Sequence, residues 1–415
     1  MNDRFPMGLR ALPAGLSLLL ATALACAAAP ALAKPQPPAK SAAKSPSKSA
    51  SRPGTKPAAK PAAKATTRSR GKAAAPAVRG VPAKTAVAAG AAAGVGAAAM
   101  AAGSESSKAE ASLSSAELAA LQQRAEQGEA SAQYALGSLY KRGQDVPLNA
   151  ETAARWYLKS AQQGYAPAQS DLGLMYANGR GVARDDGQAV QWYRKAAEQG
   201  DAVAQNNLGL MLAEGRGAAR DPVQAVQWFQ RSAEQGEAAG QYSLGVMYAT
   251  GRGVAEDVPQ ALRWFVAAAG QGHVDAQFNA GMLYAEGGAV DRDMAQAAQW
   301  LEKAAEQGNA AAQSNLGVLY ANGQGVPASD EQAAHWLQRA AQQGDALAQS
   351  NLASLYASGK GVERSPSQAY FWMLLAAGKD RSLATKRDSM AGPLNAAERA
   401  RVERQAAAWK PRPAP

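Results

Sequence analysis

The sequence has almost none of the residues that carry redox, metal or acid–base chemistry. Its 415 residues include one cysteine, Cys26, and two histidines, His273 and His335. A single thiol excludes an intramolecular disulfide framework and a CxxC metal site. Histidine is the commonest acid–base residue and metal ligand, so its scarcity points the same way. Neither an HExxH motif, a P-loop nor a Ser/His/Asp arrangement is present. We therefore expect no enzyme, no cofactor and no metal.

Acidic residues are missing from one long segment. Residues 34–103 contain 13 Lys or Arg and no Asp or Glu, and residues 1–33 have a net charge of +1. Because the whole chain is +11, the remainder is −3 and the basic character belongs to a tail. This segment also lacks aromatic residues, so no core can offset the entropy of ordering its backbone. We expect residues 34–112 to form a disordered tail rich in Lys, Pro and Ala.

The tail has two interpretations. It is either a solvated spacer or a segment that binds anionic polymers, such as cell-wall or lipid phosphates. Export of the chain argues against nucleic acid as its partner. The Ala/Gly-rich end of the tail, residues 87–103, has too few large apolar side chains to span a membrane.

Residues 1–33 read as a secretory signal. Arg4 and Arg10 precede an apolar stretch over residues 12–25, and Ala31-Leu32-Ala33 offers a small-x-small cleavage site. The alternatives are a lipoprotein signal, with residues 23–26 as a loose lipobox and Cys26 as the anchor, or an uncleaved anchor. The sequence therefore predicts an exported chain, periplasmic or secreted, with no transmembrane span once it is mature.

The rest of the chain repeats itself every 36 residues without an insertion. Tryptophan recurs at this step, as do a glutamine and a unit-closing glycine. The tryptophans are Trp156, Trp192, Trp228, Trp264, Trp300, Trp336 and Trp372. The glutamines are Gln133, Gln169, Gln205, Gln241, Gln277, Gln313 and Gln349. Seven units follow, at 129–164, 165–200, 201–236, 237–272, 273–308, 309–344 and 345–380.

Each unit contains two amphipathic helical patterns and no strand pattern. In the second unit, Ala168, Leu172 and Met175 fall on one helix face, and Gly179 suits a left-handed cap. The next helix is expected over residues 186–198, with Trp192 on its buried stripe. The sequence predicts an all-α fold, an α-solenoid of seven 36-residue helix-turn-helix repeats with a disordered N-terminal tail.

A glycine recurs in the middle of the first helix, where it costs about 1 kcal/mol relative to alanine. Six units have it, and the seventh has Ala353. The repeated cost predicts a close approach between the two helices of a unit. We expect the contact to be with the tryptophan of the second helix.

The pattern resembles the Sel-one-like repeat family, a branch of the tetratricopeptide-like α-solenoids. In the second unit the motif falls on Ala168, Leu172, Gly173, Tyr176, Gly179, Gly181, Val182, Ala189, Trp192, Ala196, Ala197 and Gly200. The departures in other units are Leu212 for Tyr, Ala280 for Leu, Ala289 for the second loop glycine, and Gln144-Asp145 in the first loop. The flanks look like a capping helix within 113–128 and closing helices with a short tail over 381–415. The resemblance implies a scaffold or adaptor.

By analogy with tetratricopeptide solenoids, the first helices would line a groove that binds a protein or peptide. The variable positions there supply the candidate partner-binding residues. They are Asn207, Asn279, Asn315, Asn351, Asp171, Tyr134, Tyr242, Phe278 and Asn206. An Asn amide both donates and accepts, so a row of them suits an extended backbone. Each Asn could instead bond to a loop of its own chain, and the aromatic side chains could pack between repeats.

Two functions remain open at this point. The first is a non-catalytic adaptor of the bacterial cell envelope that binds a protein or peptide in the solenoid groove. The second is an envelope-associating protein whose basic tail binds cell-wall or lipid polyanions, with the solenoid as a spacer. The sequence identifies neither the partner nor the pathway.

Overall fold

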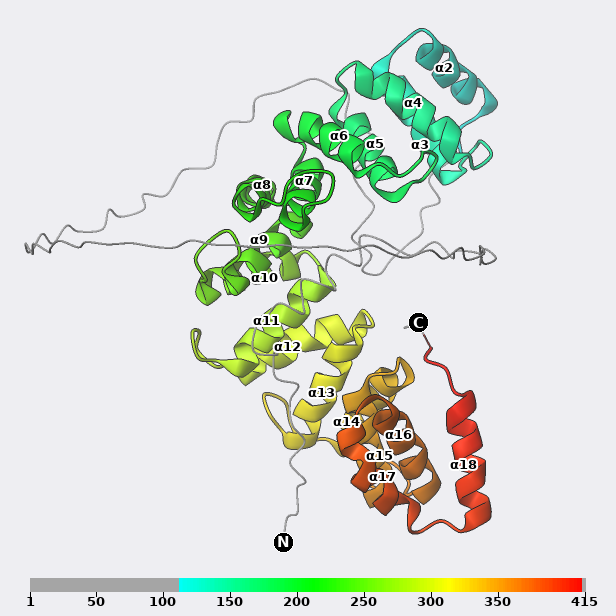
Figure 1. Ribbon diagram of the computed structural model, residues 1–415, viewed down its shortest axis with the longest axis vertical. Helices are drawn as coiled ribbons and strands as arrows, with labels where there is room; N and C mark the ends of the chain where they lie inside the picture. The colour runs from blue at the N-terminus through cyan, green and yellow to red at the C-terminus, as the bar shows by residue number, and fades with distance from the viewer. Residues whose placement is uncertain (1–111, 413–415) are drawn as a thin grey trace, which may run out of the picture. The chain divides into compact units, whose positions relative to one another are not determined.

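The structure is a computed structural model that describes residues 112–412, so the predicted signal peptide and nearly all of the predicted tail lie outside the described residues. Over residues 112–412 the chain forms seventeen α-helices and one short 3-10 helix, and no strand. The predicted all-α fold is confirmed. Figure 1 shows the helices following one another as antiparallel pairs, from α2 to α18.

Each repeat contributes a first and a second helix. The first helices are α3 (Ala130–Arg142), α5 (Ala166–Asn178), α7 (Ala202–Glu214), α9 (Ala238–Thr250), α11 (Val274–Glu286), α13 (Ala310–Asn322) and α15 (Ala346–Ser358). The second helices are α4 (Ala150–Gln162), α6 (Asp186–Glu198), α8 (Pro222–Glu234), α10 (Val258–Gly270), α12 (Met294–Glu306), α14 (Asp330–Gln342) and α16 (Pro366–Lys379).

Local chemistry sets the ends of these helices. Helix α5 ends at Gly179, whose φ of 64° and ψ of 36° are left-handed and whose N–H donates to Met175 O. Helix α6 begins after Asp185, whose carboxylate accepts a hydrogen bond from the Gln188 N–H at 2.9 Å. The same two signals recur in most units, which is why the helices keep nearly the same length.

Each helix packs against the helices before and after it in the chain. Apolar side chains from both neighbours share one core; α6, α7 and α8, for example, bury Tyr193, Leu208 and Phe229 together. The repeat tryptophans lie at the edge of this core, where Trp192, Trp228, Trp336 and Trp372 are buried and the other three are half-buried. A single unit has no core of its own, so the repeats stabilise one another.

The mid-helix glycines do mark a close helix approach, but the expected partner was wrong. A Cβ added at Gly173 would lie 2.8 Å from the Tyr193 ring, and one at Gly209 would lie 2.6 Å from the Phe229 ring. The ring over the glycine is thus the residue after the tryptophan. A one-residue step turns a side chain by about 100° around a helix, which directs the tryptophan towards the preceding repeat instead. Trp192, for example, shares a core with Tyr157 and Ala161.

The second loop glycine packs against the preceding repeat. A Cβ at Gly181, where φ is 73°, would lie 2.1 Å from Ala150 O. The first unit has no preceding repeat, and there Asp145 adopts a φ of 58° and accepts a hydrogen bond from the Leu113 N–H at 3.0 Å. The fifth unit has Ala289, and its helix ends differently, with Gly287 at φ 74° and ψ −148°.

Shorter elements cover both ends of the repeats. Helix α2 (Ser115–Glu126) opens with a capping box between Ser114 and Glu117 and packs on α3. After α16 come η1 (Arg381–Leu383), α17 (Ala384–Ala391) and α18 (Ala396–Ala408), and α17 and α18 both pack on α16. Over residues 112–412 no helix combines the length and the apolar character needed to cross a membrane.

Candidate partner-binding face

The predicted groove residues lie on the first helices, one and two residues after the invariant glutamine. We call the second of these positions the asparagine row; it holds Ala135, Asp171, Asn207, Ser243, Asn279, Asn315 and Asn351. Consecutive first helices meet along it. The Ser243 hydroxyl on α9 donates to Asn206 Oδ1 on α7 at 2.9 Å, and Asn315 Nδ2 on α13 contacts Met282 Sδ on α11 at 3.2 Å.

The invariant glutamines hold this row in place. Gln205 Nε2 donates to Ala197 O at 3.1 Å, and Gln205 Oε1 accepts from Gln235 Nε2 at 2.7 Å. The second glutamine comes 30 residues after the first, so each pair ties a first helix to the end of the second helix of its own unit, while the carbonyl belongs to the unit before. The pairing recurs at Gln133 with Gln163, Gln169 with Gln199, Gln241 with Gln271, Gln277 with Gln307, and Gln313 with Gln343. The repetition of both glutamines is visible in the sequence, but their pairing is not.

Three members of the asparagine row have little exposed surface. Asn279 is 2% exposed, Asn315 0% and Asn351 8%, whereas Asn207 is half-buried. Neither amide atom of Asn279 has a hydrogen-bond partner within residues 112–412, and the same is true of Asn351 Nδ2 and of the neighbouring Ser314 hydroxyl. This stretch is therefore short of donors and acceptors. A buried amide without a partner costs about 1–3 kcal/mol.

The aromatic candidates pack within the solenoid. The Tyr134 ring stacks on Tyr157 at a centroid distance of 5.4 Å, and the Tyr242 ring stacks on His273 at 4.4 Å. Phe278 is half-buried and borders the core of α11 to α14. Burial raises the pKa of the Tyr134 hydroxyl above its usual range, with the nearby Asp171 carboxylate adding to the effect. Tyr134 thus stays neutral and can donate a hydrogen bond across the whole physiological pH range.

The one charged member of the row is already paired. Asp171 Oδ1 lies 2.8 Å from Lys141 Nζ, and both side chains are mostly buried. An ion pair at this position leaves the row without a free charge. The asparagine row therefore offers amides, hydroxyls and small apolar surfaces to a partner.

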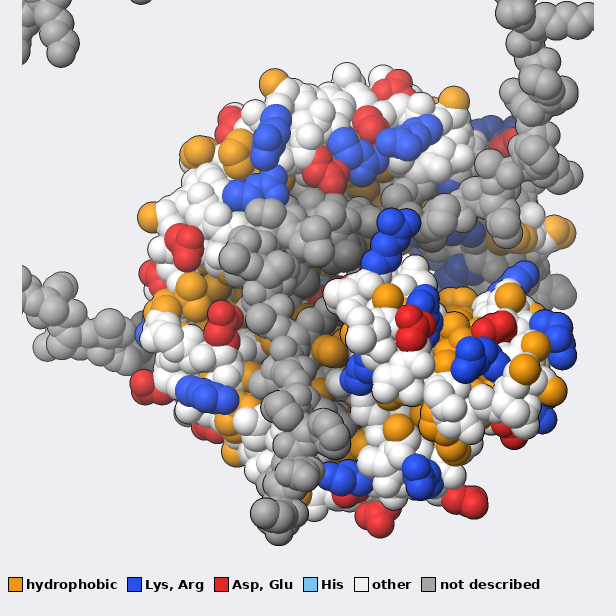
Figure 2. Space-filling view, turned by 60° about the horizontal axis from the view of Figure 1, so that its bottom comes forward, with side chains coloured by type: hydrophobic (Ala, Val, Ile, Leu, Met, Phe, Trp, Pro, Cys, Tyr) orange, Lys and Arg blue, Asp and Glu red, His pale blue; other side chains and the backbone are white. Residues whose placement is uncertain are grey.

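Charged side chains of both signs lie on one face of the described residues. Figure 2 shows Lys and Arg side chains lying among Asp and Glu side chains on the face it displays. Several cations lie over repeat tryptophans, with Lys195 Nζ 4.0 Å from the Trp192 ring centroid and Lys303 Nζ 4.1 Å from that of Trp300. No group of three or more His, Cys, Asp or Glu within residues 112–412 is placed to hold a metal ion.

Two solved structures are similar to this chain over most of its repeats. A protective antigen present in uropathogenic Escherichia coli strains, which displays an SLR fold, is 37% identical with a TM-score of 0.64; the match covers 69% of this chain and 62% of that one. The present chain thus spans about three fifths of the length of that relative. A Sel1 repeat protein from Oxalobacter formigenes is 36% identical with a TM-score of 0.52, and the match covers 67% of this chain and 81% of that one. No curated protein matches the chain.

The Sel1 repeat family model matches seven consecutive segments, which start one residue later than the units drawn from the sequence. They are 130–165, 166–201, 202–237, 238–273, 274–309, 310–345 and 346–380. Sel1 repeats generally mediate protein–protein interaction, and solenoids built from them are typically scaffolds without catalytic activity. The seven matches span more than half of the chain, which therefore belongs to the Sel1 repeat family.

Proposed function

We propose that this protein is a non-catalytic scaffold of the bacterial cell envelope that binds a protein or peptide along its asparagine row. One observation carries the proposal: Asn279 and Asn351 hold buried amide atoms that have no partner within the described chain. The backbone of an extended peptide supplies both donors and acceptors, so it would satisfy these amides once a change of side-chain rotamer turns their atoms towards the surface. The family's general role in protein interaction supports the same conclusion.

The row suits a partner whose backbone atoms, and not its side chains, are recognised. Apart from Ala135, its members are amides, one hydroxyl and Asp171, whose charge is neutralised by Lys141. Binding that uses neutral hydrogen bonds and small apolar contacts depends only weakly on salt, because screening acts on charges. We therefore propose an extended, uncharged stretch of the partner as the segment that contacts the row.

A photo-crosslinking amino acid at Asn207 tests the proposal in the intact full-length protein. Asn207 is half-buried on the row, and Gln227 on α8 is an exposed site on a second helix for the matched control. We expect one recurrent protein adduct from position 207 that is absent from position 227 and is lost in the Asn279→Leu variant. Equal adducts from both positions would contradict the proposal.

The envelope location is part of the proposal and rests on residues 1–33. Sequencing the N-terminus of the mature protein tests it: cleavage after Ala33 supports simple export, and a lipid on Cys26 supports the lipoprotein alternative.

Removal of residues 34–103 separates the two functions, because a spacer or wall-binding tail is dispensable for partner capture by the repeats. Loss of capture in that deletion would contradict the assignment of binding to the asparagine row.

A further inference from the structure

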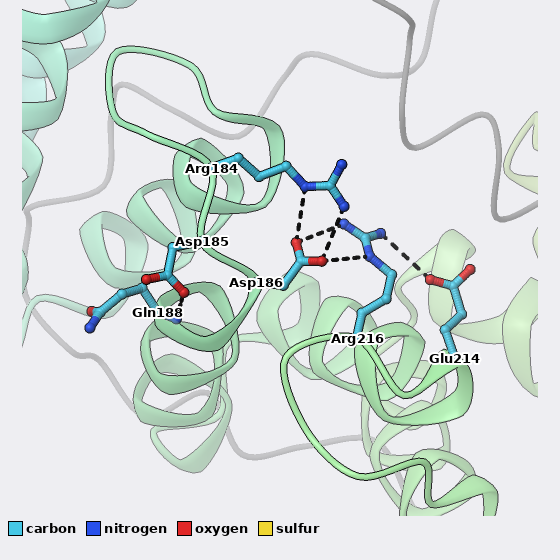
Figure 3. Close-up of polar contacts among 6 residues, drawn as sticks. All are labelled: Arg184, Asp185, Asp186, Gln188, Glu214 and Arg216. Carbon is cyan, nitrogen blue, oxygen red and sulfur yellow. Dashed lines mark hydrogen bonds and ion pairs between the residues drawn. The ribbon is translucent and has the colours of Figure 1, made fainter. Parts of the chain in front are cut away.

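One carboxylate at a junction between repeats is held by two arginines (Figure 3). Asp186, the first residue of α6, accepts from Arg184 Nε at 3.4 Å and Nη2 at 3.1 Å, and from Arg216 Nε at 3.3 Å and Nη2 at 3.1 Å. Arg216 also pairs with Glu214 at 3.5 Å. Hydrogen bonding to Arg216, then to Arg184, holds the pKa of Asp186 below its usual value, although burial opposes this. We call this arrangement the arginine clamp.

The next repeat has both arms of the clamp but lacks the carboxylate. Moving each position by 36 residues places Arg220 for Arg184, Arg252 for Arg216 and Pro222 for Asp186. The backbone around the two sites is the same. A Cβ added at Gly217 would lie 2.0 Å from Asp186 O, and one added at Gly253 would lie 2.2 Å from Pro222 O. The loop that carries Arg252 therefore packs against Pro222 as the loop of Arg216 packs against Asp186.

Without a carboxylate between them, the two arginines share one backbone oxygen. Arg220 Nε donates to Ala213 O at 3.2 Å, and Arg252 Nη2 lies 3.5 Å from the same atom. Neither forms an ion pair with an acidic group of residues 112–412, Glu256 on the neighbouring loop included. A guanidinium carries five N–H donors, so most of the donors at this site have no acceptor within residues 112–412.

The positive charges of Arg220 and Arg252 lie close together at a partly buried position. Burial lowers the pKa of Arg252 and the nearby Arg220 lowers it further, while Glu214 acts in the opposite direction. Arg252 is half-buried and Arg220 is exposed, so an incoming group can reach both. An anion placed between the two guanidiniums would relieve their repulsion and use their free donors.

A hydrogen bond to a carbonyl at the end of a helix explains the presence of one arginine at this site. It does not explain the presence of two. In the seventh repeat Arg364 Nε donates to Ala357 O at 3.2 Å, which is the bond that Arg220 makes, and no second arginine joins it. In the fifth repeat Arg292 contacts Met294 Sδ at 3.4 Å, and the position of the second arm is Gln324. Among the seven repeats, only the pair Arg220 and Arg252 combines both arms with a non-acidic residue at the clamped position.

We propose that Arg220 and Arg252 bind a carboxylate of the protein partner, an acidic side chain that takes the place Asp186 occupies one repeat earlier. A carboxylate is favoured over a phosphate because the chain's own clamp holds a carboxylate, with two donors from each guanidinium. This inference rests on the proposed function only in that a protein partner supplies the acidic group. It adds a charged, orienting contact to the neutral contacts proposed for the asparagine row.

The test uses the full-length protein and the arginine Nε–H signals of its NMR spectrum, assigned from the Arg220→Gln and Arg252→Gln variants. Hexaglutamate is titrated at fixed ionic strength, with inorganic phosphate as the second probe. We expect saturable shifts at Arg220 and Arg252 with hexaglutamate. The Arg364→Gln variant, which removes a single capping arginine of the same kind, should bind hexaglutamate as the unmodified protein does.

A second variant restores the missing acid without removing either arginine. Pro222→Asp places a carboxylate at the first position of α8, where α6 and α14 already carry Asp186 and Asp330. It should weaken hexaglutamate binding at least tenfold while the helical circular dichroism spectrum is unchanged. Absence of saturable shifts, unaltered binding by Pro222→Asp, or phosphate binding at least tenfold tighter than hexaglutamate would each overturn the proposal. Crosslinking at Asn207 does not involve these residues, so its outcome reports separately on the proposed function.

Discussion

The Gln199 side-chain amide donates a hydrogen bond of 2.7 Å to Gln169 Oε1, and Gln169 Nε2 in turn donates to Ala161 O at 3.0 Å. The side chain of the residue that follows α6 thus joins a buried side chain of α5, which joins the backbone at the end of α4. The link recurs across six repeats, so neighbouring units are fixed to one another at a buried polar point as well as by apolar packing.

The glutamine link predicts unequal effects for its two members. Gln205→Ala removes a buried side chain with both of its hydrogen bonds, whereas Gln235→Ala removes an exposed side chain and leaves only Gln205 Oε1 without its partner. We expect Gln205→Ala to lower the free energy of unfolding by about 2–4 kcal/mol, because two hydrogen bonds of about 1 kcal/mol each are lost and the truncated side chain leaves a cavity. Gln235→Ala should cost less, because it breaks one hydrogen bond and opens no cavity. Urea denaturation of both variants checks this, and equal losses would contradict it.

The link is incomplete in the seventh repeat, where Lys379 replaces the second glutamine. Gln349 Oε1 is buried without a partner within residues 112–412, and Lys379 Nζ contacts only Gly344 O. Gln343 shows that a glutamine at this position can reach both the carbonyl, at 3.0 Å, and the buried Oε1, at 2.8 Å. Lys379→Gln should therefore stabilise the chain by about 1 kcal/mol, the usual net value of a hydrogen bond. A lower urea midpoint in this variant would show that the lysine, not the glutamine, is the better residue here.

We expect alanine at a mid-helix glycine to destabilise the protein, whereas helix propensity alone predicts that it stabilises the helix. Gly209→Ala should destabilise by about 1–3 kcal/mol, because its Cβ would lie 2.6 Å from the Phe229 ring. Gly270→Ala, at the end of α10 and with no atom near its added Cβ, should gain up to about 1 kcal/mol. Thermal unfolding of the two variants separates the effects. A stabilised Gly209→Ala protein would mean that the ring moves aside at no cost.

His273 predicts a pH dependence of stability. Its Nδ1 accepts a hydrogen bond from the Ala276 N–H at 3.3 Å, which only the neutral ring can do, and burial lowers its pKa although Asp275 acts against this. Because the folded pKa is lowered, the contribution is complete above the unfolded value of about 6.5 and is lost as the pH falls below it. The midpoint temperature of thermal unfolding should therefore decrease as the pH is lowered from 7.5 to 5.

The control for this effect is His273→Asn, since Asn309 caps α13 at the same position of the next repeat. This variant should keep the cap and lose the part of the pH dependence that His273 causes. Identical profiles for the two proteins would assign the pH dependence to other groups.

The sequence predicts the fold almost completely and the site only in outline. Strict spacing of Trp192 and its equivalents defines the units, and Gly179 and Asp185 define helix ends, because these signals act within a few residues. Contacts between helices are a different matter. That Tyr193, and not Trp192, covers Gly173 depends on the rotation of one helix against another, which spacing does not contain.

The same limit applies to the polar contacts. Gln169 and Gln199 are both visible as repeated residues, yet their pairing requires the stacking geometry. The arginine clamp is hidden for the same reason, since Arg216 reaches a carboxylate 30 residues earlier in the chain. Once the structure has shown the clamp, the 36-residue spacing shows that Pro222 occupies the position equivalent to Asp186.

The most direct test of the asparagine row is a paired measurement on Asn279→Leu: its unfolding free energy and its dissociation constant for the protein that crosslinks to position 207. Because neither amide atom of Asn279 has a partner in the described chain, we expect stability to be unchanged or higher and the dissociation constant to rise at least tenfold. Lower stability together with unchanged affinity would show that Asn279 serves the fold, and would contradict the account.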